Sequence, residues 1–365
     1  MVSASATRAG DAARAEGGDR AIAAWLFVCC AMIFLMVVIG GLTRLTLSGL
    51  SITEWEPVSG IVPPLSGADW AAEFAKYQAI PQYKLINAGM SLAQFKTIFW
   101  WEYTHRLWGR LIGLVYLLPF LYFLVRRRIP RRLVAPLAGI FALGAAQGVL
   151  GWWMVESGLA HRIEVSQYRL TAHLALALAI YAATLWTALG LIGPRASRPH
   201  VSSDAGETPA VHIGGWLRRA GEAVLCLVAI TIVAGGFTAG LNAGLVYNTF
   251  PLMGGSFVPG EYTELTPFFR NWFENVAAVQ FDHRVLAMTT AASILALWLV
   301  ARRAAVPRPA RAALHALLAA VALQFALGVS TLLLVVPTPL AAAHQAGAVL
   351  LLTAAIVFRH QLHAR

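Results

Sequence analysis

The stretch IAAWLFVCCAMIFLMVVIGGLT, residues 22–43, contains no charged side chain and is long enough to cross a lipid bilayer as a helix. A transmembrane helix needs about 20 predominantly apolar residues. Further predominantly apolar stretches follow along the chain, at 107–125, 132–152, 170–192, 221–241, 284–301, 312–335 and 340–358. The sequence therefore predicts an all-α membrane protein with eight transmembrane helices.

The composition and the distribution of charge agree with this prediction. Of the 365 residues, 58% are hydrophobic and 12% are charged, and the mean hydropathy is +0.66, which excludes an ordinary soluble domain. The net charge of +11 comes from basic residues in short connections, most clearly RRRIPRR at 126–132. The positive-inside rule explains this pattern more simply than a nucleic-acid partner does, so we expect no nucleic-acid binding. Both termini should then be cytoplasmic, while the connections 44–106, 153–169, 242–283 and 336–339 should face outward.

Short motifs recur in the second half of the chain. IGGLTRLTLSGLS at 39–51 is similar to AGGFTAGLNAGLV at 234–246, and EYTHR at 102–106 aligns with QFDHR at 280–284. The remaining pairs are AQGVLG (146–151) with LQFALG (323–328) and TAHLALA (171–177) with AAHQAGA (342–348). Each copy begins on the same side of the membrane, so the sequence predicts two parallel four-helix repeats related by an axis along the bilayer normal.

This reading divides the chain into five parts. We expect a cytoplasmic tail at 1–21, a first repeat at 22–192, a second repeat at 221–358 and a cytoplasmic tail at 359–365. The segment 193–220 is rich in Pro, Ser, Gly and Arg and is predicted to be a cytoplasmic linker without structure of its own. The first 20 residues lack an apolar core and do not resemble a cleaved signal peptide.

Four of the ten histidines occupy equivalent positions near the outward ends of the even-numbered helices: His105, His173, His283 and His344. A single histidine near a helix end is usually an interfacial side chain. Four in register across a duplicated unit instead favour axial ligation of haem, in which neutral imidazoles on facing helices bind one iron. Zinc would require a tighter ligand cluster. We therefore predict one haem between His105 and His173 and another between His283 and His344.

Charged residues next to these histidines distinguish the two copies. Arg106 and Arg284 follow two of the predicted ligands and could contact haem propionates, although each could also be an ordinary interfacial arginine. Glu102 lies three residues before His105, so it shares a helix face with that histidine, whereas the second copy has Gln280 there. This difference indicates chemistry at the first haem and electron transfer at the second. The alternative is that Glu102 serves only as an ion-pair partner of Arg106 or Arg110.

The motifs EYTHRLWGR at 102–110, GGLTRLTLSGLSITEW at 40–55 and NTFPLMGG at 248–255, together with the four histidines, resemble the haem A synthase family. The resemblance covers nearly the whole chain. It implies that haem O is the substrate, bound by His105 and His173, and that haem B is a permanent cofactor, bound by His283 and His344. It further implies that the C8 methyl group of haem O is oxidised to a formyl group with the participation of Glu102, giving haem A for cytochrome c oxidase.

Some members of the family carry cysteine pairs in the outer loops, and this sequence has none there, which resembles the alphaproteobacterial and mitochondrial branch. The resemblance implies a multi-pass protein of the bacterial inner membrane, or alternatively of the mitochondrial inner membrane. Candidate partners besides membrane lipid are haem O synthase, cytochrome oxidase assembly factors and a second copy of the chain in a homo-oligomer. The alternative function is a dihaem b-type cytochrome that exchanges electrons with a quinone pool.

Overall fold

The structure is a computed structural model that describes residues 2–56, 59–159, 162–192 and 215–363, with side chains described from Gly17 onward. Within these ranges the regular structure is helical, apart from one isolated bridge between Met253 and Ser256. Eight helices are long and apolar enough to cross a membrane, which confirms the eight predicted spans. They are α1 (Val2–Leu45), α4 (Leu92–Val125), α5 (Arg131–Leu159), α6 (Gln167–Ile192), α7 (Gly215–Gly240), α9 (Val276–Ala301), α10 (Arg308–Leu333) and α11 (Thr338–His363).

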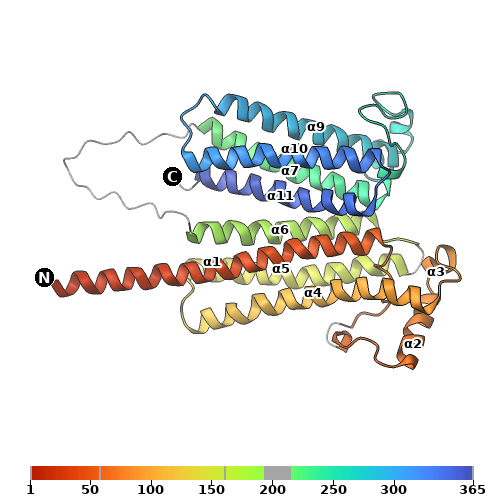
Figure 1. Cartoon of the computed structure of the whole chain (residues 1–365), viewed down its shortest axis with the longest axis horizontal. Helices are drawn as coiled ribbons and strands as arrows, with labels where there is room; N and C mark the ends of the chain where they lie inside the picture. Colours follow the sequence, from red (N-terminus) through yellow and green to blue (C-terminus); the bar gives the residue numbers. More distant parts are fainter. Residues whose placement is uncertain (1, 57–58, 160–161, 193–214, 364–365) are drawn as a thin grey trace.

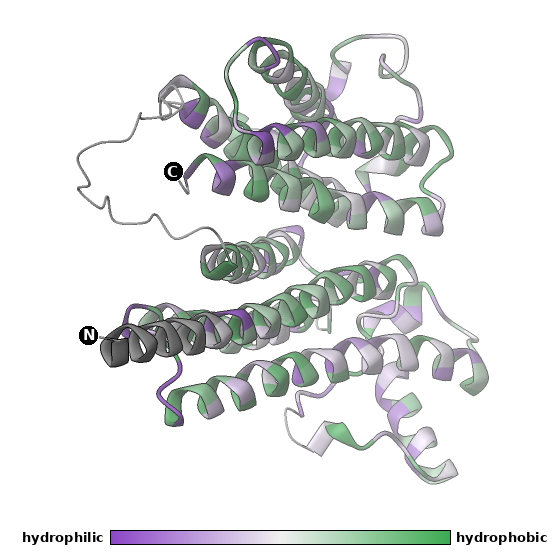
Figure 2. Cartoon of the chain, turned by 60° about the vertical axis from the view of Figure 1, so that its left-hand side comes forward, coloured by the Kyte–Doolittle hydropathy of each residue, from purple (hydrophilic) through white to green (hydrophobic). Residues whose placement is uncertain are grey.

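The long helices run side by side in two groups (Figure 1). In the first group, α4 and α6 each contact both α1 and α5; in the second, α9 and α11 each contact both α7 and α10. Helices α6 and α7 contact each other, and α11 contacts α1 and α6, so the groups are joined along their length. Figure 2 shows that the long helices are predominantly hydrophobic, as the bilayer requires.

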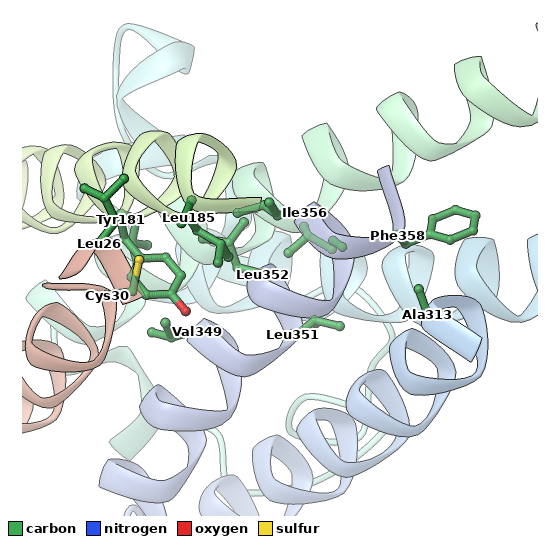
Figure 3. Packing of buried hydrophobic residues seen from close by; sticks show 14 of the residues in the cluster. Leu26, Cys30, Tyr181, Leu185, Ala313, Val349, Leu351, Leu352, Ile356 and Phe358 are labelled. Atoms are coloured by element: carbon green, nitrogen blue, oxygen red, sulfur yellow. The ribbon is translucent and has the colours of Figure 1, made fainter. Parts of the chain in front are cut away.

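A single hydrophobic core crosses the boundary between the groups. Leu26 of α1, Tyr181 of α6 and Leu352 of α11 belong to the same buried cluster (Figure 3). The hydroxyl of Tyr181 also forms a 2.7 Å hydrogen bond with the hydroxyl of Thr353. Packing of α1 and α6 against α11 therefore fixes the two groups relative to each other.

The first outer connection is more ordered than the sequence indicates. It contains α2 (Gly67–Gln78) and α3 (Pro81–Leu85), and α4 begins at Leu92 rather than near 107. Ser91 caps α4 by accepting a hydrogen bond from the Gln94 amide, while the Gln94 side chain accepts one from the Ser91 amide. A buried cluster then packs the start of α4 against α2 and the preceding loop: Leu50, Trp70, Tyr77, Ile80, Phe95, Ile98, Phe99 and Tyr103. Hydropathy alone misses this extension because Gln94, Lys96, Glu102, His105 and Arg106 interrupt its apolar residues.

The outer ends of the two groups are joined by polar contacts. Arg44, near the end of α1, donates to the Asn242 side-chain oxygen at 2.7 Å, and Asn242 donates to both carboxylate oxygens of Glu164 at 2.9 and 3.0 Å. Asn242 has a φ of 53°, and asparagine tolerates this left-handed conformation better than most residues. Helix α9 begins nearby, where Asn275 accepts hydrogen bonds from the Ala277 and Ala278 amides.

Several helix ends differ from the predicted boundaries. Helix α1 already begins at Val2, within the expected tail 1–21, and α11 continues to His363. The predicted linker 193–220 lies mainly on 193–214, outside the described residues, and its last part is helical because α7 begins at Gly215. Helices extend beyond an apolar stretch because their backbone hydrogen bonds do not depend on hydropathy.

Candidate functional site

The four predicted ligands lie on four different long helices: His105 on α4, His173 on α6, His283 on α9 and His344 on α11. Each lies in the half of its helix nearer the outer connections, and each is half-buried. Helices α4 and α6 are diagonal to each other in the first group, and α9 and α11 are diagonal in the second. His105 is close enough to His173 for an electrostatic interaction, and the same holds for His283 and His344. The structure thus brings the histidines together in the predicted pairs; ligation of haem remains a prediction.

Every one of these imidazoles packs against a glycine on a neighbouring helix. A Cβ atom placed on Gly40 of α1 would lie 3.1 Å from His105 Nε2, and one on Gly151 of α5 would lie 2.9 Å from His173 Cε1. In the second group, the corresponding glycines are Gly235, at 3.0 Å from His283 Cε1, and Gly328, at 2.8 Å from His344 Cε1. Only glycine allows the ring and the helix backbone to approach this closely.

These glycines were present in the sequence motifs but were not assigned a role there. Gly40 and Gly235 stand at the same place in IGGLTRL and AGGFTAG, and Gly151 and Gly328 both end the AQGVLG and LQFALG motifs. The recurrence of these glycines in both copies indicates that they have equivalent roles. Its meaning emerges only from the packing, because each glycine is far in sequence from the histidine that it contacts.

Polar groups hold the histidines of the second pair at their Nδ1 atoms. His283 Nδ1 lies 3.2 Å from the Thr231 carbonyl oxygen, and His344 Nδ1 lies 3.1 Å from Gln324 Nε2. At His283, the carbonyl partner places the ring proton on Nδ1 and leaves Nε2 as the ligand atom; at His344, the amide donates to Nδ1 and orients the ring. His173 Nδ1, in contrast, is buried without a hydrogen-bond partner among the described residues.

Gln147 and Gln324 form hydrogen bonds across helices. Gln147 Nε2 donates to the His173 carbonyl oxygen at 2.9 Å, and Gln324 Nε2 donates to the His344 carbonyl oxygen at 3.0 Å. Both amide oxygens are buried without a partner among the described residues. The two glutamines therefore tie α5 to α6 and α10 to α11 at the level of the histidines.

Glu102 is buried, with 2% of its surface exposed, and both oxygens of its carboxylate have partners. Oε1 forms an ion pair with Arg106, at 2.6 Å from Nη2. Oε2 accepts hydrogen bonds from the Ser51 hydroxyl and the Ile52 amide, both at 2.8 Å. The structure thus shows the ion-pair partnership that the sequence left open as an alternative, and adds two partners from the outer loop that the sequence did not indicate.

Arg106 and Arg284 both hold the loop that follows the first helix of their group. Arg106 donates to the carbonyl oxygens of Ile52 and Glu54 at 2.6 and 2.8 Å. Arg284 donates to the carbonyl oxygens of Tyr247 and Thr249 at 2.6 and 2.7 Å. The described contacts of both arginines are therefore largely structural, and a contact with haem propionates remains a prediction.

The residue one turn before each arginine takes part in the same anchoring. Glu102 accepts from the Ile52 amide, whereas Gln280, which is also 2% exposed, donates to the Tyr247 carbonyl oxygen at 3.1 Å. The second group therefore has a neutral amide where the first group has a carboxylate, and both side chains keep a contact with their outer loop.

The arrangement fits an iron porphyrin in each group. In each group the two imidazoles come from diagonal helices, and a glycine of an adjacent helix lets each ring pack close to the backbone. Imidazoles on two facing helices suit the axial ligation of a macrocycle held between them. In the described part of the chain, no three His, Cys, Asp or Glu side chains form a cluster that could hold a bare metal ion. The cysteines are unpaired, with Cys29 and Cys30 buried in α1 and Cys226 exposed on α7.

The chain is similar to known proteins over nearly its whole length. Residues 23–356 match the model of the COX15-CtaA family, described as cytochrome oxidase assembly protein. The chain is 54% identical over 344 residues to a heme A synthase of Nitrosospira multiformis, covering 94% of each chain. It is also 44% identical over 353 residues to heme A synthase COX15 of Homo sapiens, covering 95% of this chain and 84% of the human protein. The chain therefore belongs to the COX15-CtaA family of cytochrome oxidase assembly proteins.

Proposed function

We propose that this protein is a haem A synthase, an oxidoreductase that converts the C8 methyl group of haem O to a formyl group and so supplies haem A to cytochrome c oxidase. The observation that carries this proposal is the pair of histidine sets on diagonal helices, in which each imidazole packs against a glycine of the neighbouring helix. Relatives of similar length named heme A synthase support it.

The two histidine pairs would serve different haems. We assign haem O, the substrate, to His105 and His173, and a resident haem B to His283 and His344. The assignment rests on the carboxylate of Glu102 near the first pair and the neutral Gln280 near the second. It is also supported by the Nδ1 contacts of His283 and His344, because fixed imidazoles suit a permanent cofactor. The second haem would relay the electrons that the oxidation releases.

Glu102 would act through its charge. Oxidation of the substrate leaves positive charge and protons in an apolar region, where a carboxylate near His105 stabilises them more strongly than it would in water. Arg106, Ser51 and Ile52 keep this carboxylate in place beside the first histidine pair. Arg106 and Arg284 would add propionate contacts to their role in anchoring the loops.

We propose further that the chain consists of two parallel four-helix repeats, 22–192 and 221–358, with both termini in the cytoplasm. Recurrent contacts support the duplication: Arg106 binds Ile52 and Glu54, and Arg284 binds Tyr247 and Thr249. The α1 N-terminus and the α11 C-terminus lie at the end opposite the outer connections in Figure 1. The basic connections at that end support a cytoplasmic side.

The eight helices make this a multi-pass membrane protein, and we place it in the bacterial inner membrane. Apart from its propionates haem O is hydrophobic and would reach the first site through the bilayer, so haem O synthase is a candidate donor. Cytochrome oxidase assembly factors and a homo-oligomer are further candidate partners.

Extraction and chromatography of the pigments from purified protein would test this function. We expect haem B together with haem O or haem A, and conversion of haem O to haem A when the protein is supplied with substrate and an electron acceptor. Pigment that consists of haem B alone at both histidine pairs, without such conversion, would instead favour the dihaem b-type cytochrome.

A further inference from the structure

A pocket of about 210 Å³ lies between α9 and α10, at the end of the bundle opposite the outer connections (Figure 1). Two arginines line it, Arg302 directly after α9 and Arg311 in the first turn of α10, and we call them the arginine pair. Helix α9 runs toward this end and α10 runs away from it, so Trp298 and His315, each four residues from an arginine, lie one turn further into the bundle. These two aromatic residues form the ring pair of the pocket.

A hydrogen bond holds the ring pair together. Trp298 Nε1 donates to His315 Nδ1 at 3.0 Å, and the ring centroids are 6.1 Å apart in an edge-to-face arrangement. Because Nδ1 accepts this hydrogen bond, the proton of the neutral imidazole is on Nε2, where it can be donated. Within the ranges that the structure describes, this Nε2 atom has no acceptor. His315 is therefore an oriented residue of the pocket lining with an unused N–H donor.

The arginine pair has no anionic partner within the described part of the chain. The Arg302 guanidinium lies over the Trp298 ring, with Cζ 5.5 Å from the centroid, and Arg311 donates one hydrogen bond to the Ala304 carbonyl oxygen at 3.1 Å. No ion pair among the described residues includes either arginine, and the sequence contains no Asp or Glu after Asp282. Most of the guanidinium N–H donors are therefore unused, and the uncompensated positive charge attracts an anion.

Apolar residues surround these polar groups. Three further lining residues are apolar and buried: Ala301, Val306 and Leu314. Leu295 and Leu299 are exposed and lie three residues before Trp298 and Arg302, so they continue along the same side of α9 into the membrane. The pocket is smaller than the roughly 300–1,000 Å³ that enclose a whole drug-sized ligand. Its size therefore suits a small anionic group whose hydrocarbon chains lie outside it.

We propose that this pocket binds the phosphate of an anionic phospholipid. The arginine pair would bind the phosphate oxygens, because a guanidinium matches phosphate with two parallel hydrogen bonds, and His315 would donate a further hydrogen bond from Nε2. The acyl chains would lie along Leu295 and Leu299. Basic pockets between transmembrane helices bind acidic lipid head groups in this way.

The positive-inside rule explains why arginines occur at this end of the helices, but it does not require that they flank a hydrogen-bonded ring pair. The positive charge of the pocket would also disfavour the choline group of phosphatidylcholine, so the site should select anionic lipids. This proposal does not depend on the assignment of either haem.

Native mass spectrometry of the purified full-length protein can test this site. The protein would be titrated with dioleoylphosphatidylglycerol, with dioleoylphosphatidylcholine, which has the same chains, and with inorganic phosphate. We expect the first phosphatidylglycerol to bind more tightly than phosphatidylcholine, and millimolar inorganic phosphate to leave it bound.

Arg302→Gln should weaken binding of the first phosphatidylglycerol by roughly tenfold, because charge-assisted hydrogen bonds are lost, and should leave phosphatidylcholine binding unchanged. Arg302 is exposed and donates no hydrogen bond to the described backbone, so the fold should tolerate its replacement. Arg303→Gln is the matched control: Arg303 is the next residue, is exposed and does not line the pocket. It removes the same charge, but its effect should stay below about twofold in roughly 0.15 M salt, which screens exposed charges beyond about 8 Å.

His315→Leu provides a second, independent variant, because it keeps both arginines and removes only the Nε2 donor. It should weaken phosphatidylglycerol binding severalfold. An equal effect of Arg302→Gln and Arg303→Gln would overturn the proposal, because it would show that the lipid responds only to the general charge of this end. Equal affinity for the two lipids would overturn it as well. Displacement of phosphatidylglycerol by millimolar inorganic phosphate would assign the pocket to free phosphate and not to a lipid.

Discussion

The guanidinium of Arg106 pairs with the carboxylate of Glu102 one helical turn away, with Nη2 and Oε1 2.6 Å apart, and only 3% of the glutamate side chain is exposed. Breaking a buried ion pair by removing one partner is costly, because the other charge remains buried. The same pair also holds the outer loop through Ile52. Glu102 therefore has a structural role besides its proposed role in the oxidation. A variant that keeps the loop contacts but removes the negative charge distinguishes the two roles.

Glu102→Gln is expected to retain both haems and to abolish or stall haem A formation. The amide oxygen can still accept from the Ser51 hydroxyl or the Ile52 amide, as Gln280 preserves a loop contact in the second group, but the negative charge is lost. The measurement is the ratio of haem O to haem A in pigment extracts, together with the thermal stability of the purified variant. Normal haem A formation would show that the carboxylate is needed only for structure.

Arg284→Ala is expected to destabilise the second group. Arg284 is 7% exposed and donates to the carbonyl oxygens of Tyr247 and Thr249, so its removal takes away charged hydrogen bonds that hold the outer loop. Hydrogen bonds from charged groups suggest a loss of about 2–3 kcal/mol in the free energy of unfolding. Thermal unfolding in detergent and proteolysis of the loop near Thr249 would detect it. Alanine at the exposed Arg303 provides the comparison and should change neither measurement.

Gly235→Ala and Gly328→Ala are each expected to lower the haem B content. The added methyl group would lie 3.0 and 2.8 Å from the rings of His283 and His344, so the imidazoles must move. The haem absorption spectrum and the haem-to-protein ratio would report the change. Gly144→Ala serves as a control, because a Cβ there meets nothing within 4 Å. Full haem B occupancy in both variants would argue against a fixed bis-histidine site.

His283→Ala and His344→Ala are each expected to remove haem B while haem O still binds to the first group. The two histidine pairs lie in separate four-helix groups, so loss of one haem need not empty the other site. Chromatography of the extracted pigment separates haem B from haem O and haem A. If either variant retained haem B at the level of the unmodified protein, a different residue would be the ligand.

The sequence by itself determined the eight membrane-spanning helices, because hydropathy and length are local properties that the bilayer imposes on each segment separately. It also indicated which histidines to pair, because residues duplicated in register occupy equivalent places in a fold. The family motifs pointed to the same family that the comparisons show. None of these inferences requires knowledge of contacts between distant residues.

Only the tertiary structure decided how these residues meet. Gly151 of α5 faces His173 of α6, and Ser51 of the outer loop binds Glu102 of α4. Each of these relationships joins segments from different helices or loops. Such contacts depend on helix crossing and close packing, which a linear pattern of apolar and polar residues does not specify.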